Sequence, residues 1–173
     1  LTVTATNANS GSYQLDGGTV VNFSALTSLT FNAGGGNDTL ILNHPAATLF
    51  APSGGIFYNG GGQTTSPNGD SLTINGASLS LTSVTHRFDP PGADGNNGWI
   101  QEVLGPTTNT ITYTGLEPVT HNAPAADVYF TFTGGLETVT LDALGTLDNQ
   151  IRSTLGESVD FLNPSSSLTI NLE

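Results

Sequence analysis

The sequence predicts an all-β fold, a β-solenoid of the parallel β-helix type or, as the alternative, an antiparallel β-sandwich. Apolar residues alternate with Thr, Ser or Asn in short runs along the chain, and clusters of Gly, Asn, Asp and Pro separate the runs. Similar short sequence segments also recur at intervals, as they do in repeat architectures. We favour the solenoid because the Gly-rich and Pro-rich insertions between the runs are long for hairpins.

Helical spacing is approached in one segment, Leu141–Arg152, where Gly145 weakens it. Strand alternation, which turns one face inward and the other outward, starts with Leu1–Thr6. The expected strands that follow, in chain order, are Thr19–Phe23, Ser28–Phe31, Thr39–Leu42, Ile56–Tyr58, Ser71–Ile74, Ser78–Leu81, Asn109–Tyr113, Val128–Thr133, Glu137–Leu141, Ser158–Leu162 and Ser167–Leu172.

We predict one β domain over residues 1–173, a length that buries a sizeable core without disulfides. Internal repetition divides it into two related halves, about 19–104 and 109–173. Val21–Leu26 returns as Ile111–Leu116, and Ser71–Asn75 returns as Ser167–Asn171.

Composition excludes several classes of function. A net charge of −12 with two Lys and Arg residues in total argues against binding along a phosphate backbone, which depends on basic side chains. The absence of cysteine excludes thiolate chemistry, and no apolar run is long enough to span a bilayer. The three histidines are scattered, and Ser71 of Gly69-Asp70-Ser71-Leu72 opens a strand, so no catalytic set is apparent. We therefore expect no enzymatic activity.

Four segments resemble repeats of very large secreted or surface proteins of bacteria, planctomycetes especially: Val21–Leu42, Ile111–Val119, Ser153–Val159 and Ser167–Asn171. The resemblance implies a modular, β-rich extracellular stretch with no assigned catalytic residues. The composition, free of Cys and Lys and rich in Thr, Asn and Gly, also suits a secreted or cell-surface protein. Gly34, Gly36, Asp38 and Leu40 resemble a single copy of the calcium-binding nonapeptide repeat.

Calcium is the one cofactor that we consider, with Asp38, Asp89, Asp94 and Asn96 as candidate ligands. Asp38 comes from the nonapeptide resemblance, and the other three lie in the polar segment Asp89–Gly98. Their carboxylate and amide oxygens are the hard ligands that Ca²⁺ prefers. A solvated turn is the alternative, because the bidentate Glu of a calcium loop is missing there.

Two aromatic residues, Trp99 and Tyr58, are candidates for stacking against sugar rings. Flat aromatic faces bind sugars, although large aromatic residues in β-proteins also fill cores. Glycans are therefore possible partners of this chain.

The chain opens and closes within strand patterns that carry no capping helix and no charged edge. We read it as a processed product or a piece of a longer chain, with ends that pair with identical subunits or flanking modules. The candidate assembly residues are Leu1, Val3, Leu168, Ile170 and Leu172. The expected function is a structural or adhesive extracellular module, assembling end to end into a filament or forming part of a longer surface protein. A surface carbohydrate-binding module is the alternative, and an extracellular hydrolase or lyase ranks below it.

Overall fold

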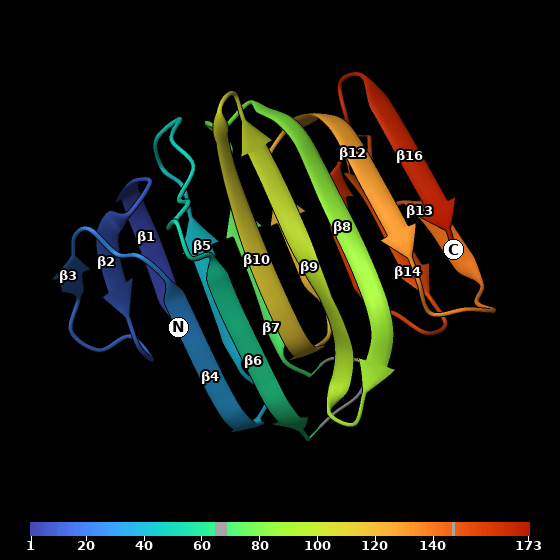
Figure 1. Ribbon diagram of the computed structural model, residues 1–173, viewed down its shortest axis with the longest axis horizontal. Coiled ribbons are helices and arrows are strands. Elements are labelled where there is room, and N and C mark those ends of the chain that lie inside the picture. Colours follow the sequence, from blue (N-terminus) through green and yellow to red (C-terminus); the bar gives the residue numbers. More distant parts are fainter. Residues whose placement is uncertain (65–68, 147) are drawn as a thin grey trace.

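The computed structural model describes residues 1–64, 69–146 and 148–173, which form two β-sheets that enclose one core (Figure 1). Sheet A has the order β13-β14-β15-β11-β7-β5-β1-β2-β3, and sheet B has the order β16-β12-β8-β9-β10-β6-β4. The strands of sheet A are β1 (Thr2–Asn7), β2 (Ser10–Gln14), β3 (Val21–Phe23), β5 (Thr39–Asn43), β7 (Ser71–Asn75), β11 (Val119–Asn122), β13 (Val139–Ala143), β14 (Asp148–Ser153) and β15 (Ser158–Leu162). Those of sheet B are β4 (Leu29–Gly36), β6 (Ile56–Gln63), β8 (Leu81–Gly92), β9 (Gly95–Leu104), β10 (Thr107–Leu116), β12 (Ala125–Phe132) and β16 (Ser167–Leu172).

The all-β prediction is confirmed, and the described residues contain no helix. No helix that could cross a membrane occurs in the ranges that the structure describes. Both sheets are mixed. Sheet A has a parallel centre, in which β1, β5, β7, β11 and β15 run side by side, with antiparallel strands at both ends. In sheet B, β9 is antiparallel to its neighbours β8 and β10, and the other pairs are parallel.

The chain crosses between the sheets repeatedly, from β4 to β5, from β6 to β7 and from β10 to β11. The crossings place successive strands side by side along the longest axis of the molecule, from β3 and β4 at one end to β13 and β16 at the other (Figure 1). The strands themselves lie across that axis. Each sheet therefore grows in the direction in which its strands are hydrogen bonded.

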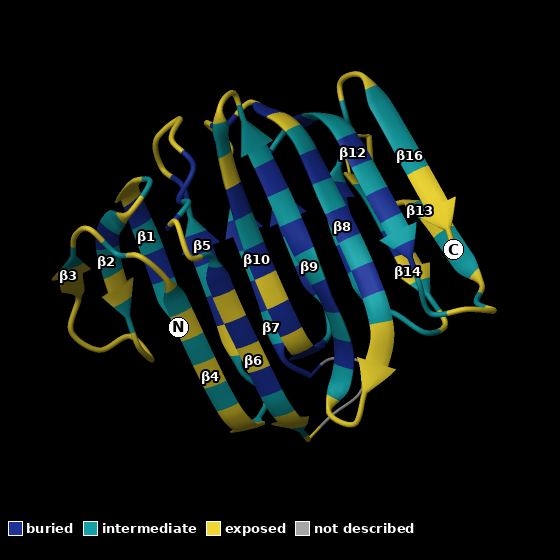
Figure 2. Cartoon of the chain, in the orientation of Figure 1, coloured by how far each residue is buried: buried dark blue, intermediate teal, exposed yellow. Residues whose placement is uncertain are grey.

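Buried and exposed residues alternate along most strands, which places one face of each sheet against the core (Figure 2). The parallel register stacks similar residues on one another. Leu40, Leu72, Val119 and Val159 form one buried row across sheet A. In sheet B, Phe88 and Phe132 are partners in the register, and their ring centroids lie 4.4 Å apart. Each strand thus adds one apolar side chain to a row of similar side chains, and these rows fill the core.

Two polar ladders follow the same register on the outside of the sheets. Asn75 Nδ2 donates to Asn43 Oδ1 over 3.0 Å, and Asn122 Nδ2 donates to Asn75 Oδ1 over 3.2 Å. In sheet B, Asn59 Nδ2 donates to Asn32 Oδ1 over 2.6 Å. A side-chain amide both donates and accepts, so stacked Asn residues satisfy one another along the ladder.

Two local expectations were wrong. The described residues of Leu141–Arg152 are not helical but form the antiparallel pair β13 and β14, with Leu141 opposite Ile151. Asp89–Gly98 is not a loop but the end of a long hairpin between β8 and β9. Its Pro and Gly residues fit there because the register shifts between Asp89 and Gly92.

The repeated phrases occupy different sheets. Ser71–Asn75 is strand β7 of sheet A, whereas Ser167–Asn171 lies in β16 of sheet B. Val21–Phe23 is the edge strand β3 of sheet A, whereas Ile111–Leu116 lies in β10 of sheet B. The repeated segments share a strand pattern, with apolar residues on one face and Thr or Asn on the other.

Candidate functional site

Four carboxylates form a column at the turn where the chain enters the strands of sheet A. Asp38, Asp70, Glu117 and Glu157 each stand two residues before a member of the buried row Leu40, Leu72, Val119 and Val159. A spacing of two residues keeps a side chain on the same face of the strand, so these carboxylates follow the inward-facing row. We call this set the acidic column.

Backbone hydrogen bonds join the segments that carry neighbouring members of the acidic column. Ser71 N donates to Asp38 O over 2.8 Å, and Glu117 N donates to Asp70 O over 2.6 Å. Asp38 N donates to Asp70 Oδ1 over 2.7 Å, which holds the Asp70 side chain against the neighbouring rung. Asp70 is 0% exposed and Glu157 is 2% exposed, so these two carboxylates are enclosed by protein.

Two tyrosines approach the column from sheet B. Tyr58 on β6 is fully buried, and its hydroxyl donates to Asp38 O over 3.0 Å. Tyr113 on β10 is its register partner, and its buried hydroxyl faces Glu157. Close packing of the backbone supports the arrangement. A Cβ at Gly60 would lie 2.3 Å from the Gly115 carbonyl oxygen and 2.6 Å from Asp70 Oδ2.

Burial and like charge disfavour ionisation within the column. Burial raises the pKa of Asp70; the hydrogen bond from Asp38 N opposes that rise, and the Asp38 carboxylate adds to it. Burial raises the pKa of Glu157 to about 8; the hydrogen bond from Tyr113 opposes the rise, and the charge of Glu117 adds to it. Burial, together with the Glu157 carboxylate, raises the pKa of Tyr113. At neutral pH Glu157 therefore holds a proton.

A pocket of about 290 Å³ opens at the Glu117 and Glu157 end of the column. Asn96 Nδ2 donates to Glu117 Oε1 over 3.2 Å at its wall. Arg152 also lines the pocket, but its Nη2 pairs with Asp142 Oδ2 at 2.8 Å. The carboxyl of Glu157 and the hydroxyl of Tyr113 are both buried behind this pocket and interact with each other. The remaining lining residues are Gln150, Ser153, Gly156 and Ser158.

All three histidines converge in the core, which the sequence did not indicate. The rings of His86 and His121 meet edge to face, with centroids 5.4 Å apart. His121 Nε2 lies 3.2 Å from Glu102 Oε1, and Asn109 Nδ2 donates to Glu102 Oε2 over 2.9 Å. The charge of Glu102 also acts on His44. The five residues are buried, so this is a polar island inside the apolar core.

The electrostatics of this island follow from burial. Burial lowers the pKa of His44, and it lowers the pKa of His86 further below the ordinary value. Burial alone would raise the pKa of Glu102, but the ring of His121 and the charge of His44 lower it below the usual range. Both ring nitrogens of His86 lack a hydrogen-bond partner. Among the described residues, no group of three or more His, Asp or Glu side chains is arranged to hold a metal ion.

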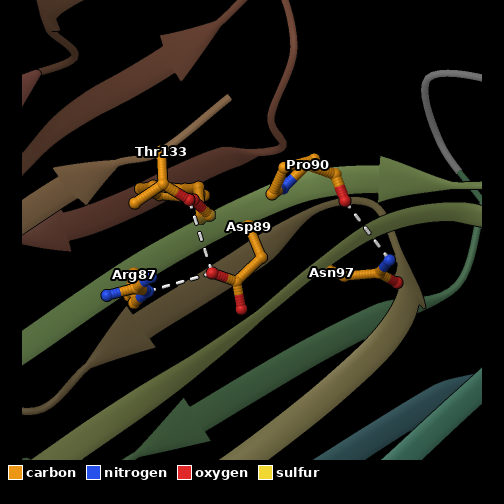
Figure 3. Close-up of polar contacts among 6 residues, drawn as sticks. Arg87, Asp89, Pro90, Asn97 and Thr133 are labelled. Atoms are coloured by element: carbon orange, nitrogen blue, oxygen red, sulfur yellow. Dashed lines mark hydrogen bonds and ion pairs between the residues drawn. The ribbon is translucent and has the colours of Figure 1, made fainter. Parts of the chain in front are cut away.

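The four predicted calcium ligands have separate surroundings. Asp38 belongs to the acidic column, and Asn96 reaches the column through Glu117. Asp89 instead accepts from Arg87 Nε over 2.9 Å and from Thr133 Oγ1 over 3.4 Å (Figure 3). The Asp94 carbonyl accepts from Gln63 Nε2 over 3.4 Å.

The two predicted sugar-stacking residues have different environments. Tyr58 is buried and stacks on Phe31 with centroids 5.2 Å apart, so its ring has no face open to a sugar and this part of the prediction was wrong. Trp99 is half-buried on β9, between Thr112 and Arg87 in the register. It alternates with the buried Gly98 and Ile100, which places it on the outer face of sheet B.

Of the five predicted assembly residues, three lie on an edge strand, whereas Leu1 and Val3 lie at β1, which β2 and β3 separate from the edge of sheet A, and Val3 is buried. Leu1 and Val3 line an apolar pocket of about 240 Å³ at the β1 end. Leu168, Ile170 and Leu172 lie on the edge strand β16 at the other end.

The chain was compared with protein-family models, curated proteins and solved structures, and none of them matched.

Proposed function

We propose that this chain is a structural module of an extracellular assembly and that it associates end to end. In this reading the two sheets are the walls of a flattened β-solenoid, and each end offers open strand edges to a second copy or to a flanking module. The composition and the resemblance to secreted bacterial repeats support the extracellular location.

The observation that carries the proposal is that the inward-facing rows of the core continue into exposed residues at both ends. In sheet B, the buried Val128, Phe130 and Phe132 pair with Leu168, Ile170 and Leu172 of β16. Ile170 and Leu172 are exposed although they continue that row. In sheet A, the buried Ile151 pairs with the exposed Leu141 of β13. At this end, therefore, the apolar face of the outermost strands stays partly exposed.

The opposite end has the same character. The row of Val3 runs through Tyr13 to Val21, and both of these are exposed. Among the large apolar side chains that are exposed in the described residues, Phe57 is the one that lies away from the two ends. The others are Tyr13, Leu15, Val20 and Val21 at one end and Leu136, Leu141, Leu144, Ile170 and Leu172 at the other.

Strand direction fits a head-to-tail contact. In sheet B the edge strands β4 and β16 run in the same direction, because β9 reverses the direction twice. In sheet A the edge strands β3 and β13 also share a direction, since two antiparallel pairs separate each from the parallel centre. A copy translated along the long axis therefore meets its neighbour with parallel edges in both sheets. A heterologous contact of this kind does not close and extends into a filament.

The test is sedimentation velocity over a range of concentrations, with negative-stain microscopy of the same samples. Ile170→Lys is compared with Phe57→Lys, because the two wild-type residues are 38% and 39% exposed and only Ile170 lies at an end. Wild type and Phe57→Lys should form larger species as concentration rises, and Ile170→Lys should weaken association about tenfold or more. A wild-type chain that stays monomeric at every concentration refutes the proposal, as does equal weakening by both variants.

A second candidate function, glycan binding, is favoured by one row of residues on the outer face of sheet B. Phe57, Thr112 and Trp99 are consecutive in the register, and Arg87 follows Trp99. The row therefore offers two aromatic rings, separated by a hydroxyl, on one flat surface. Titration of Trp99 fluorescence with a panel of oligosaccharides tests this function, with Trp99→Ala measured by calorimetry. A panel that leaves the fluorescence unchanged dismisses it.

A further inference from the structure

The two edge strands of sheet B, β4 and β16, carry the ends of the same inward-facing rows. Leu29 on β4 and Ile170 on β16 are the ends of one row, which runs in register through every strand of the sheet, and Phe31 and Leu172 are the ends of the next. We propose that β16 of a second copy of this chain docks beside β4 in the register that continues these rows, with its Ile170 in the apolar pocket at the β1 end. The inference rests on the proposed end-to-end association and names the surfaces that meet.

The receiving surface is the apolar pocket of about 240 Å³, which lies between the two sheets. Leu29 lines it from sheet B, and Val3, Tyr13 and Phe23 line it from sheet A. The remaining lining residues are Leu1, Leu26 and Thr30. Apart from the hydroxyls of Tyr13 and Thr30, the lining side chains are apolar, so the pocket suits an apolar side chain. It lies where the core would continue if another strand followed β4.

The entering surface is the inward face of β16. Ile170 is 38% exposed and Leu172 is 64% exposed, although the residues beside them on β12 are buried. Register partners on neighbouring strands point to the same face of a sheet, so Ile170 of the second copy would project inward beside Leu29. Leu172 of the second copy would lie beside Phe31, as it lies beside Phe132 in its own chain. Docking therefore removes the exposed apolar side chains of β16 from water.

Sheet A accepts the same displacement of the second copy. Val21 on the edge strand β3 and Ala143 on the edge strand β13 are the ends of one register row, and both are exposed. The copy that places Ile170 beside Leu29 therefore places Ala143 beside Val21. An edge strand also presents unpaired N–H and C=O groups, which a parallel neighbour satisfies. Both sheets thus favour one register.

Disulfide trapping tests this register, because the chain has no cysteine of its own. Thr30 and Asn171 are exposed ends of a row on the outer face of sheet B, so docking places them side by side. Neighbouring strands are about 4.8 Å apart, a Cα separation that a disulfide spans. Thr30→Cys and Asn171→Cys are made as separate chains and mixed in about 0.5 M NaCl, which screens the repulsion between chains of net charge −12. Oxidation of the mixture should give a covalent dimer, and neither variant should give one alone.

Thr169→Cys is the matched control for Asn171→Cys. Thr169 lies on the same face of β16, two residues before Asn171. In the proposed register its Cα is displaced from that of Thr30 by about 6.6 Å along the strand, which puts the two atoms about 8 Å apart, beyond the reach of a disulfide. The mixture of Thr30→Cys with Thr169→Cys should therefore cross-link at least about tenfold more slowly.

A second measurement needs no cysteine. Leu172→Ala removes an apolar side chain from the proposed contact and should weaken association about tenfold in sedimentation velocity. Leu144→Ala is its control, because Leu144 is 54% exposed at the same end but follows β13 and lies off the inward-facing rows. This control should leave association within about twofold of wild type.

The outcomes separate this inference from the proposed function. A wild-type chain that stays monomeric refutes both. Association without cross-linking of the Thr30 and Asn171 pair, or with equally fast cross-linking of the Thr30 and Thr169 pair, overturns the register and leaves end-to-end association intact. Covalent dimers of either Thr30→Cys or Asn171→Cys alone would show that like ends meet, which also overturns the inference. Equal association of Leu172→Ala and wild type overturns it without any disulfide.

Discussion

Replacing Glu157 by Gln in the absence of metal should make the protein more stable at alkaline pH. Glu157 is buried, and its pKa rises from 4.5 to about 8 on folding, chiefly because of that burial. A group whose pKa is raised by folding stabilises the fold below its unfolded pKa and loses that contribution as pH rises through its folded pKa. Wild-type stability should therefore fall between pH 4.5 and pH 8.

The size of the loss follows from the shift. A shift from 4.5 to about 8 corresponds to roughly 5 kcal/mol at pH values above both. Gln has nearly the same shape and never ionises. The variant should therefore match wild type near pH 4.5 and exceed it by several kcal/mol at pH 9. Three groups lie around Glu157: Tyr113, Glu117 and Arg152. The guanidinium of Arg152 is already paired with Asp142, so it does not offset the loss.

The assay is urea denaturation of both proteins in EDTA at half-unit steps from pH 4.5 to 9, with Glu173→Gln as the exposed control. The difference between wild type and Glu157→Gln should grow with pH and level off above pH 8. A difference that is the same at every pH would show that Glu157 ionises freely in the folded protein. That result would refute the reasoning from burial.

Three further outcomes test the packing. Gly60→Ala should destabilise the fold by about 1–3 kcal/mol, because its Cβ meets the Gly115 carbonyl, whereas Gly62→Ala on the same strand meets nothing and should cost less than about 1 kcal/mol by thermal melting. His86→Phe should stabilise the protein by about 1–3 kcal/mol, since it removes two buried nitrogens that lack partners, and it should lessen the loss of stability that wild type shows as pH falls below 6.5. Asn75→Ala breaks both hydrogen bonds of its ladder and should lower the free energy of unfolding by about 1–2 kcal/mol in urea.

Local alternation was sufficient to predict many of the strands. Ser158–Leu162 and Ser167–Leu172 agree with β15 and β16 residue by residue, because each alternates strongly between apolar and polar positions. Strand β9 was not predicted, because its first half, Gly95–Gly98, has the composition of a turn. It is held as a strand by pairing with β8 and β10 on both sides. The conformation of such a segment is decided by the strands, distant in sequence, that pair with it, and not by its local propensity.

The acidic column has a signal in the sequence that differs from the repeated segments. Each member is an acidic residue, followed two residues later by an aliphatic residue at the first or second position of a short strand, as in Asp38-Thr39-Leu40 and Glu157-Ser158-Val159. The spacings between copies are unequal, so a search for a constant offset passes over them. The histidine island had no such signal. His44 follows β5, and His86 and His121 lie on strands of opposite sheets, so the packing of sheet A on sheet B brings their rings together.

The direction of the hydrogen bonds between strands has a mechanical consequence. The strands lie across the long axis, so these bonds run along it (Figure 1). Tension applied between the two end faces would load these hydrogen bonds along their length. The strands would then separate one after another, at low force. A sideways load along the strands would instead shear many bonds at once. A fibre built from such units would extend gradually when stretched. It would resist the sliding of neighbouring strands past one another.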